Sequence, residues 1–147
     1  MYKRVFVGID GSPHSEHALQ HALGLAKALG ATVRIVHVVD LGWMPVTPEL
    51  GIAATNLEAA GREERERLLA AAMDAAKAKG VTADSRLIET TSPSQQTAAA
   101  LVDEAMRWPA DVIVIGARGR TGVERLLLGS VADGVARRST LPVLLVQ

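Results

Sequence analysis

The strongest constraint on the fold is a regular alternation of short apolar runs with longer helix-forming segments. Five runs have the composition of strands, the third being more polar than the others: residues 4–10, 31–40, 82–90, 110–116 and 141–147. Between them lie four segments of helical composition, at 12–30, 56–80, 92–108 and 130–139. Parallel strands need a crossover between them, which is usually a helix. The alternation therefore predicts an α/β protein with a parallel sheet and helices on both faces.

The length and the strand pattern predict one domain over residues 1–147, built as an open, Rossmann-like, five-stranded sheet. The expected strand order is 3-2-1-4-5, with the first strand in the middle, although the pattern alone leaves other doubly wound orders open. In the expected order, the chain leaves the first and fourth strands toward opposite faces of the sheet. A crevice then opens between their carboxyl ends, where open α/β sheets bind ligands.

The first helix and the connection after the second strand have contrasting patterns. Ser12 and Pro13 are typical of a helix start, and Gly30 is typical of a helix end. The expected buried face of this helix consists of Ala18, Ala22, Leu25 and Leu29. Residues 41–55 contain two prolines and two glycines and show no clean period, so we expect a loop there.

The fourth apolar run leads into the glycine-rich stretch "GARGRTGVERLLLGSV" at 116–131. Gly129 and Ser130 begin the next helix, where free backbone N–H groups and the positive end of the helix dipole suit a phosphate. Ser130 and Asp133 also fit a loose capping box, so simple helix capping is the alternative. The stretch matches neither the P-loop nor the dinucleotide fingerprint. The residues alone leave both interpretations open.

Charge and cysteine content argue against several classes of partner. The chain carries 16 basic and 16 acidic residues and no cysteine. Balanced charge argues against a nucleic acid or a membrane surface held by general electrostatics. The lack of cysteine excludes disulfides and thiol chemistry. The apolar run near the N-terminus is too short for a signal peptide or a membrane span, so we expect a cytoplasmic protein.

Two further groups of residues, three histidines and a charged pair, need no functional role to explain them. His14, His17 and His21 share one helix face at spacings that some zinc sites use. No cysteine is present and no carboxylate on that face completes a site, so we expect no metal site made by protein side chains. Glu63 and Arg67 form an i,i+4 pair within a charged run, which predicts a solvated helix face.

The spacing within the glycine-rich stretch is more specific than its composition. Gly116, two residues, Gly119, nine residues, Gly129 and Ser130 form the pattern G-x2-G-x9-G-[ST]. This pattern resembles the ATP-binding motif of the universal stress protein family. The opening and closing strand–helix–strand units of the chain resemble those of the same family, so that the resemblance covers nearly the whole sequence.

The resemblance implies a nucleotide site formed by strand ends and the glycine-rich stretch. It implies that adenine and ribose are bound by Gly8, Ile9, Asp10, Val38, Ile115 and Gly116, with Asp10 as the acid on the adenine side. It implies that the triphosphate is bound by Gly119, Gly129, Ser130 and Val131. Arg118 stands where family members often carry His, and its guanidinium is expected either to strengthen phosphate binding or to stay solvated.

The function that the resemblance implies is an ATP-binding regulatory protein of the stress response, acting through nucleotide-dependent conformation or partner binding. Mg²⁺ would accompany the ATP phosphates. The alternatives are a slow ATPase and a nucleotide-free dimeric interaction module; no lysine lies in 116–131, and few groups suit catalysis. A homodimer through the apolar strand at 142–147 is also implied, since an uncovered sheet edge invites pairing. Two interpretations of residues 41–55, which include Trp43 and Met44, remain open. The segment could form a lid over the nucleotide, or it could be a surface loop with a partly buried Trp.

Overall fold

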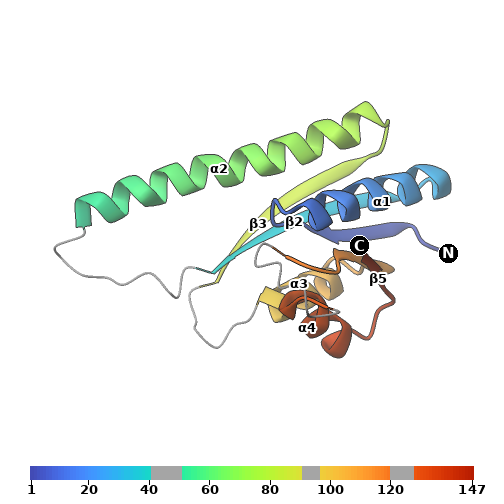
Figure 1. Cartoon of the computed structure of the whole chain (residues 1–147). Helices are drawn as coiled ribbons and strands as arrows, with labels where there is room; N and C mark the ends of the chain where they lie inside the picture. The colour runs from blue at the N-terminus through green and yellow to red at the C-terminus, as the bar shows by residue number, and fades with distance from the viewer. Residues whose placement is uncertain (41–50, 91–96, 120–127) are drawn as a thin grey trace.

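The computed structural model describes residues 1–40, 51–90, 97–119 and 128–147. Its elements follow the predicted alternation (Figure 1): β1 (Arg4–Gly8), α1 (Pro13–Leu29), β2 (Thr32–Asp40), α2 (Gly51–Ala78), β3 (Ala83–Thr90), α3 (Thr97–Arg107), β4 (Val112–Gly116), α4 (Ser130–Arg138) and β5 (Val143–Val146). In the described part of the chain, five strands form one sheet in the order β3-β2-β1-β4-β5, and neighbouring strands are parallel. The predicted fold class and strand order are therefore confirmed.

Helices cover both faces of the sheet. α1 and α2 pack on one face around a core that includes Val7 and Leu23, while α3 and α4 pack on the other around Phe6 and Ile113. Figure 1 shows α1 and α2 above the strands and α3 and α4 below them. The central strands β1 and β4 are thus buried on both faces, which explains why their sequences are continuously apolar. No helix within the described ranges has the length and apolar character needed to cross a membrane.

The loop predicted at 41–55 is wrong for residues 51–55, because α2 already begins at Gly51. Extending a helix that is already nucleated costs little free energy, and 51–55 include Ile and two Ala, which are compatible with helix. Residues 41–50, and with them the two interpretations of Trp43 and Met44, lie outside the described residues.

The buried stripe of α1 is rotated relative to the predicted one. Ala18 and Ala22 are buried as expected and Leu25 is half-buried, but Leu29, the last residue of the helix, is 51% exposed. The stripe is completed by Ser15, Leu19, Leu23 and Ala26. The sheet therefore contacts a broader face of this helix than the sequence predicted.

A carboxylate ties the start of β1 to the start of β4. Oδ2 of Asp111 accepts hydrogen bonds from the backbone N–H groups of Lys3, at 2.8 Å, and Arg4, at 2.9 Å. These backbone hydrogen bonds favour the charged form and lower the pKa of Asp111 below its ordinary value.

We expect Asp111 to contribute to the acid sensitivity of the fold. Because its pKa is lower in the folded chain than in the unfolded chain, its stabilising effect is complete above about pH 4 and is lost as the pH falls further. In thermal unfolding measured from neutral pH into this range, Asp111→Asn should lose less stability on acidification than the wild type. The same change at the exposed Asp103 of α3 is the control. Equal pH slopes for Asp111→Asn and the wild type would contradict the assignment.

A second carboxylate is buried among arginines toward the amino ends of β2 and β3. The Glu104 side chain of α3 is 4% exposed and lies 3.1 Å from Arg34, 3.7 Å from Arg86 and 3.5 Å from Arg107. Arg34 also donates two hydrogen bonds to Asp84 of β3, at 2.9 and 2.8 Å. This network joins α3 to β2 and β3 at a distance from the carboxyl ends of the strands.

Candidate functional site

A cavity of about 780 Å³ opens at the carboxyl ends of β1, β2 and β4, where the strand order reverses. The cavity is lined from both sides of the sheet, by α2 on one side and by α3 and α4 on the other. Every residue of the predicted nucleotide site lines it: Gly8, Ile9, Asp10, Val38, Ile115, Gly116, Arg118, Gly119, Gly129, Ser130 and Val131. The fold thus brings these residues together, while their roles in binding stay predictions.

The turn between β1 and α1 is ordered by short polar side chains. Asp10 Oδ1 accepts a hydrogen bond from the Ser12 N–H at 2.8 Å, and Ser15 Oγ accepts one from the Asp10 N–H at 3.0 Å. Ser12 is the N-cap of α1, and its Oγ accepts from the Ser15 N–H at 3.2 Å. Gly11 between them has φ +82°, a conformation that glycine adopts without strain. These contacts fix both the backbone and the carboxylate of Asp10.

The Asp10 carboxylate lies against the glycine-rich stretch. A Cβ built on Gly119 would stand 3.0 Å from Asp10 Oδ2, so a side chain at 119 would press on this oxygen. The resemblance assigned Asp10 to the adenine side and Gly119 to the phosphates. In the structure the two residues are neighbours, which puts a negative charge beside the expected phosphate position.

Gly116 and Gly129 allow close approaches between backbone segments. A Cβ on Gly116, at the end of β4, would lie 2.8 Å from the His14 carbonyl carbon and 3.0 Å from the Ser15 nitrogen, both in the first turn of α1. A Cβ on Gly129 would lie 3.2 Å from Arg118 Cα. The Gly129 N–H donates to the Ala117 carbonyl at 2.7 Å and closes the stretch back on β4. At Gly116 backbone occupies the space of a side chain, and at Gly129 a Cβ would require the neighbouring backbone to shift by a few tenths of an ångström.

The start of α4 bears on one of the two interpretations that the sequence left open, the capping of this helix by Ser130 and Asp133. Its N-cap is Gly129, which makes no side-chain capping hydrogen bond, and Ser130 is the first helical residue. Asp133 pairs instead with Arg137, with Nε to Oδ2 at 3.0 Å. The capping-box interpretation is therefore wrong, and neither Ser130 nor Asp133 caps the first turn of α4. This helix start lines the cavity and suits an anion.

The opposite end of the cavity has an apolar wall, with the charged side chains of α2 beside it. Ile9 at the end of β1 and Val38 and Val39 of β2 line it, together with Leu68 of α2. His37 lies beside them, and its Nδ1 is 2.7 Å from the Ile9 carbonyl oxygen, which joins the ends of β1 and β2. The cavity therefore combines a wall suited to a flat apolar ring with a helix start and glycine backbone suited to an anion.

The contribution of α2 to the cavity was missed from the sequence. Its charged run was predicted to be a solvated face, and the Glu63–Arg67 pair, at 3.6 Å with both side chains exposed, agrees with that. The same helix nevertheless lines the cavity with Gly61, Glu64, Arg65, Leu68 and Arg67 itself. The available signal was Gly61, a helix-weakening residue in a segment otherwise rich in Ala, Glu, Arg and Leu.

Among the described residues, no group of three or more His, Cys, Asp or Glu side chains is placed to hold a metal ion. His14 and His17 lie on α1 with their ring centroids 6.5 Å apart. Arg118 lines the cavity, and its contact with a phosphate stays a prediction.

Comparison with known proteins gives a consistent result along the whole chain. The model of the universal stress protein family matches residues 1–147. A universal stress protein of Methanocaldococcus jannaschii is 33% identical, with 100% of this chain and 83% of that protein aligned. Universal stress protein YxiE of Bacillus subtilis is also 33% identical, with both chains covered completely. A crystal structure of a universal stress protein in complex with cAMP is similar at a TM-score of 0.72 and 31% identity, covering 99% of this chain and 97% of that one.

Proposed function

The chain belongs to the universal stress protein family, and from that premise we propose that its crevice binds ATP and that the bound state regulates conformation or partner choice. The observation that carries the proposal is the two-ended cavity. One end offers glycine backbone and the N-terminus of α4, and the other offers the apolar wall of Ile9 and Val38. An adenine nucleotide needs both. The cAMP complex of a relative at 31% identity supports the class of ligand.

Mg²⁺ would accompany the phosphates of the nucleotide. Phosphate oxygens supply most of its ligands in nucleotide sites, so the protein needs few of its own. The Asp10 carboxylate fits this arrangement, because its Oδ2 lies beside Gly119, where a cation would offset its repulsion from the phosphates. We propose a regulatory output rather than rapid turnover, since few of the described residues that line the cavity suit catalysis.

We further propose that the protein acts in the cytoplasm as a homodimer that pairs through β5. This strand is at the edge of the sheet, and three of its four residues are only half-buried, although all four are apolar. An apolar edge strand left uncovered tends to pair with another strand. A shallow cavity between this strand and α1, lined in part by Leu25 and Leu144, continues the apolar surface.

The test of nucleotide binding begins with the purified protein. It is denatured, and any released nucleotide is identified by chromatography and mass; titration with Mg·ATP by calorimetry follows. ATP released in an amount near one per chain, or saturable binding in the titration, is the expected result. The absence of both would contradict the proposal.

Ser130→Ala should weaken ATP binding about tenfold, because one hydrogen bond to a charged phosphate is lost. The variant should keep the melting temperature of the wild type, since Ser130 makes no capping hydrogen bond. The same change at the exposed Ser85 of β3 is the matched control and should leave ATP affinity unchanged. If Ser130→Ala binds ATP as tightly as the control, the α4 start is not the phosphate site.

A further inference from the structure

One face of α2 closes the crevice above the carboxyl end of β2. Gly61, Glu64, Arg65 and Leu68 line the cavity and follow the i, i+3, i+4, i+7 spacing of one helix face, and the neighbouring Arg67 also lines it. α2 packs on β2 and β3, which places this face on the β2 side of the crevice. The family pattern in the sequence includes none of these four residues.

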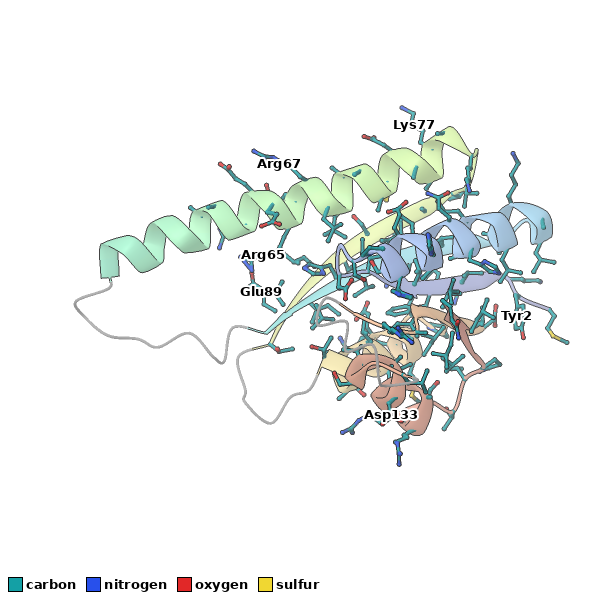
Figure 2. All side chains as sticks on the ribbon, viewed as in Figure 1. Tyr2, Arg65, Arg67, Lys77, Glu89 and Asp133 are labelled. Carbon is teal, nitrogen blue, oxygen red and sulfur yellow. The ribbon has the colours of Figure 1, made fainter. Side chains whose placement is uncertain are left out.

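The Arg65 side chain is held against its own helix by one hydrogen bond. The side chain is half-buried, and its Nε donates a hydrogen bond to the Gly61 carbonyl at 3.0 Å. Among the described residues, its two terminal nitrogens make no hydrogen bond or ion pair. Figure 2 shows Arg65 directed from α2 toward the sheet, whereas Arg67 points away from it. Arg67 is 81% exposed and pairs with Glu63.

Gly61 makes room for this arrangement. A Cβ on Gly61 would lie 3.2 Å from one terminal nitrogen of Arg65 and 3.7 Å from its central carbon. A methyl group at position 61 would therefore require the guanidinium to shift by a few tenths of an ångström. A glycine inside a helix lowers stability, so its presence here fits a need for space beside the cavity.

The strand order decides which part of a nucleotide Arg65 meets. The glycine-rich stretch follows β4, and β1 lies between β4 and β2, so the two sides of the crevice are about 10 Å apart, or two strand spacings. A triphosphate at the start of α4 leaves the base on the β2 side, where Val38 lines the cavity from the α3 side of the sheet and Leu68 lines it from the α2 side. A planar guanidinium stacks on an aromatic ring and donates to ring nitrogens.

We propose that Arg65, positioned by Gly61, contacts the base of the bound nucleotide and closes the crevice over it. The inference rests on the nucleotide-binding function proposed above. It makes α2, rather than the glycine-rich stretch alone, part of the binding site.

The test compares variants in their binding of ATP and AMP, measured by displacement of a fluorescent ATP analogue from the full-length protein. Arg65→Gln should weaken both ligands by a similar factor of about ten, because the lost contact is with the base that they share. Arg65→Lys should lose nearly as much, because it keeps the charge but not the planar group. Arg62→Gln is the matched control: Arg62 is exposed on the same helix and lies outside the cavity lining.

Three outcomes would overturn the inference. A loss for Arg65→Gln no larger than that for Arg62→Gln would mean that Arg65 makes no specific contact. A loss confined to ATP would place Arg65 at the phosphates. A wild-type protein that binds neither ligand would overturn the proposed function itself, and the inference with it.

The Gly61→Ala variant should change stability and nucleotide affinity in opposite directions. The added methyl group improves helix propensity, so the melting temperature should rise by about 2–4 °C. The same methyl group displaces Arg65, so affinity for ATP and AMP should fall in the wild-type background. In the Arg65→Gln background it should cause no further loss. A Gly61→Ala variant with unchanged affinity would show that Gly61 does not position Arg65.

Discussion

Replacing Glu104 by alanine should lower the free energy of unfolding by about 2–3 kcal/mol, because it removes a buried, charged hydrogen-bond partner of Arg34 and leaves Asp84 as the remaining one. The Glu104 side chain is 4% exposed, and Arg34, its nearest partner at 3.1 Å, is only 14% exposed. The hydrogen bond to Asp84 is the main factor that raises the pKa of Arg34, and the charges of Asp84 and Glu104 add to it against desolvation. Arg34 therefore stays charged when Glu104 is removed.

Urea unfolding followed by circular dichroism measures this effect. The control is Glu63→Ala, which removes the same side chain from an exposed pair with Arg67 on α2. That change should cost less than about 1 kcal/mol, because exposed ion pairs contribute little. Equal costs for the two variants would mean that the Glu104 network does not hold α3 on the sheet.

Gly116→Ala should both destabilise the fold and weaken nucleotide binding. The added Cβ would stand 2.8 Å from the His14 carbonyl carbon and 3.0 Å from the Ser15 nitrogen, so backbone has to move. Overpacking of this kind costs about 1–3 kcal/mol. The first turn of α1 carries Ser12 and Ser15, which hold Asp10 in place. Displacing that turn therefore disturbs the cavity as well as the core.

Gly24→Ala is the matched control for this second prediction. Gly24 lies in α1, and a Cβ there would meet nothing within 4 Å. This variant should be more stable than the wild type by up to about 1 kcal/mol, through helix propensity alone. Calorimetry for stability and an ATP titration for affinity measure both properties of each variant. A Gly116→Ala protein that unfolds and binds ATP like the wild type would contradict the close approach of β4 and α1.

The sequence predicted the architecture because apolar periodicity and helix-end signals are local properties of a chain. Ser12, Pro13 and Gly30 begin and end α1 where they were expected to. The continuous apolar runs of β1 and β4 required burial on both faces. Where local signals conflicted, the prediction failed. The prolines and glycines of 41–55 predicted a loop, but α2 begins at Gly51, the second of these glycines.

The family resemblance of the sequence supplied the predicted binding residues, and the structure brings them to one cavity because the carboxyl ends of parallel strands meet at one edge of a sheet. Tertiary structure alone decided how the elements meet there. It rejected the capping role of Ser130, placed Asp10 beside Gly119, and turned Arg65 of a charged helix toward the cavity. These facts depend on the direction in which one element presents its side chains to another. That direction is set by packing between residues far apart in the chain, which no local pattern records.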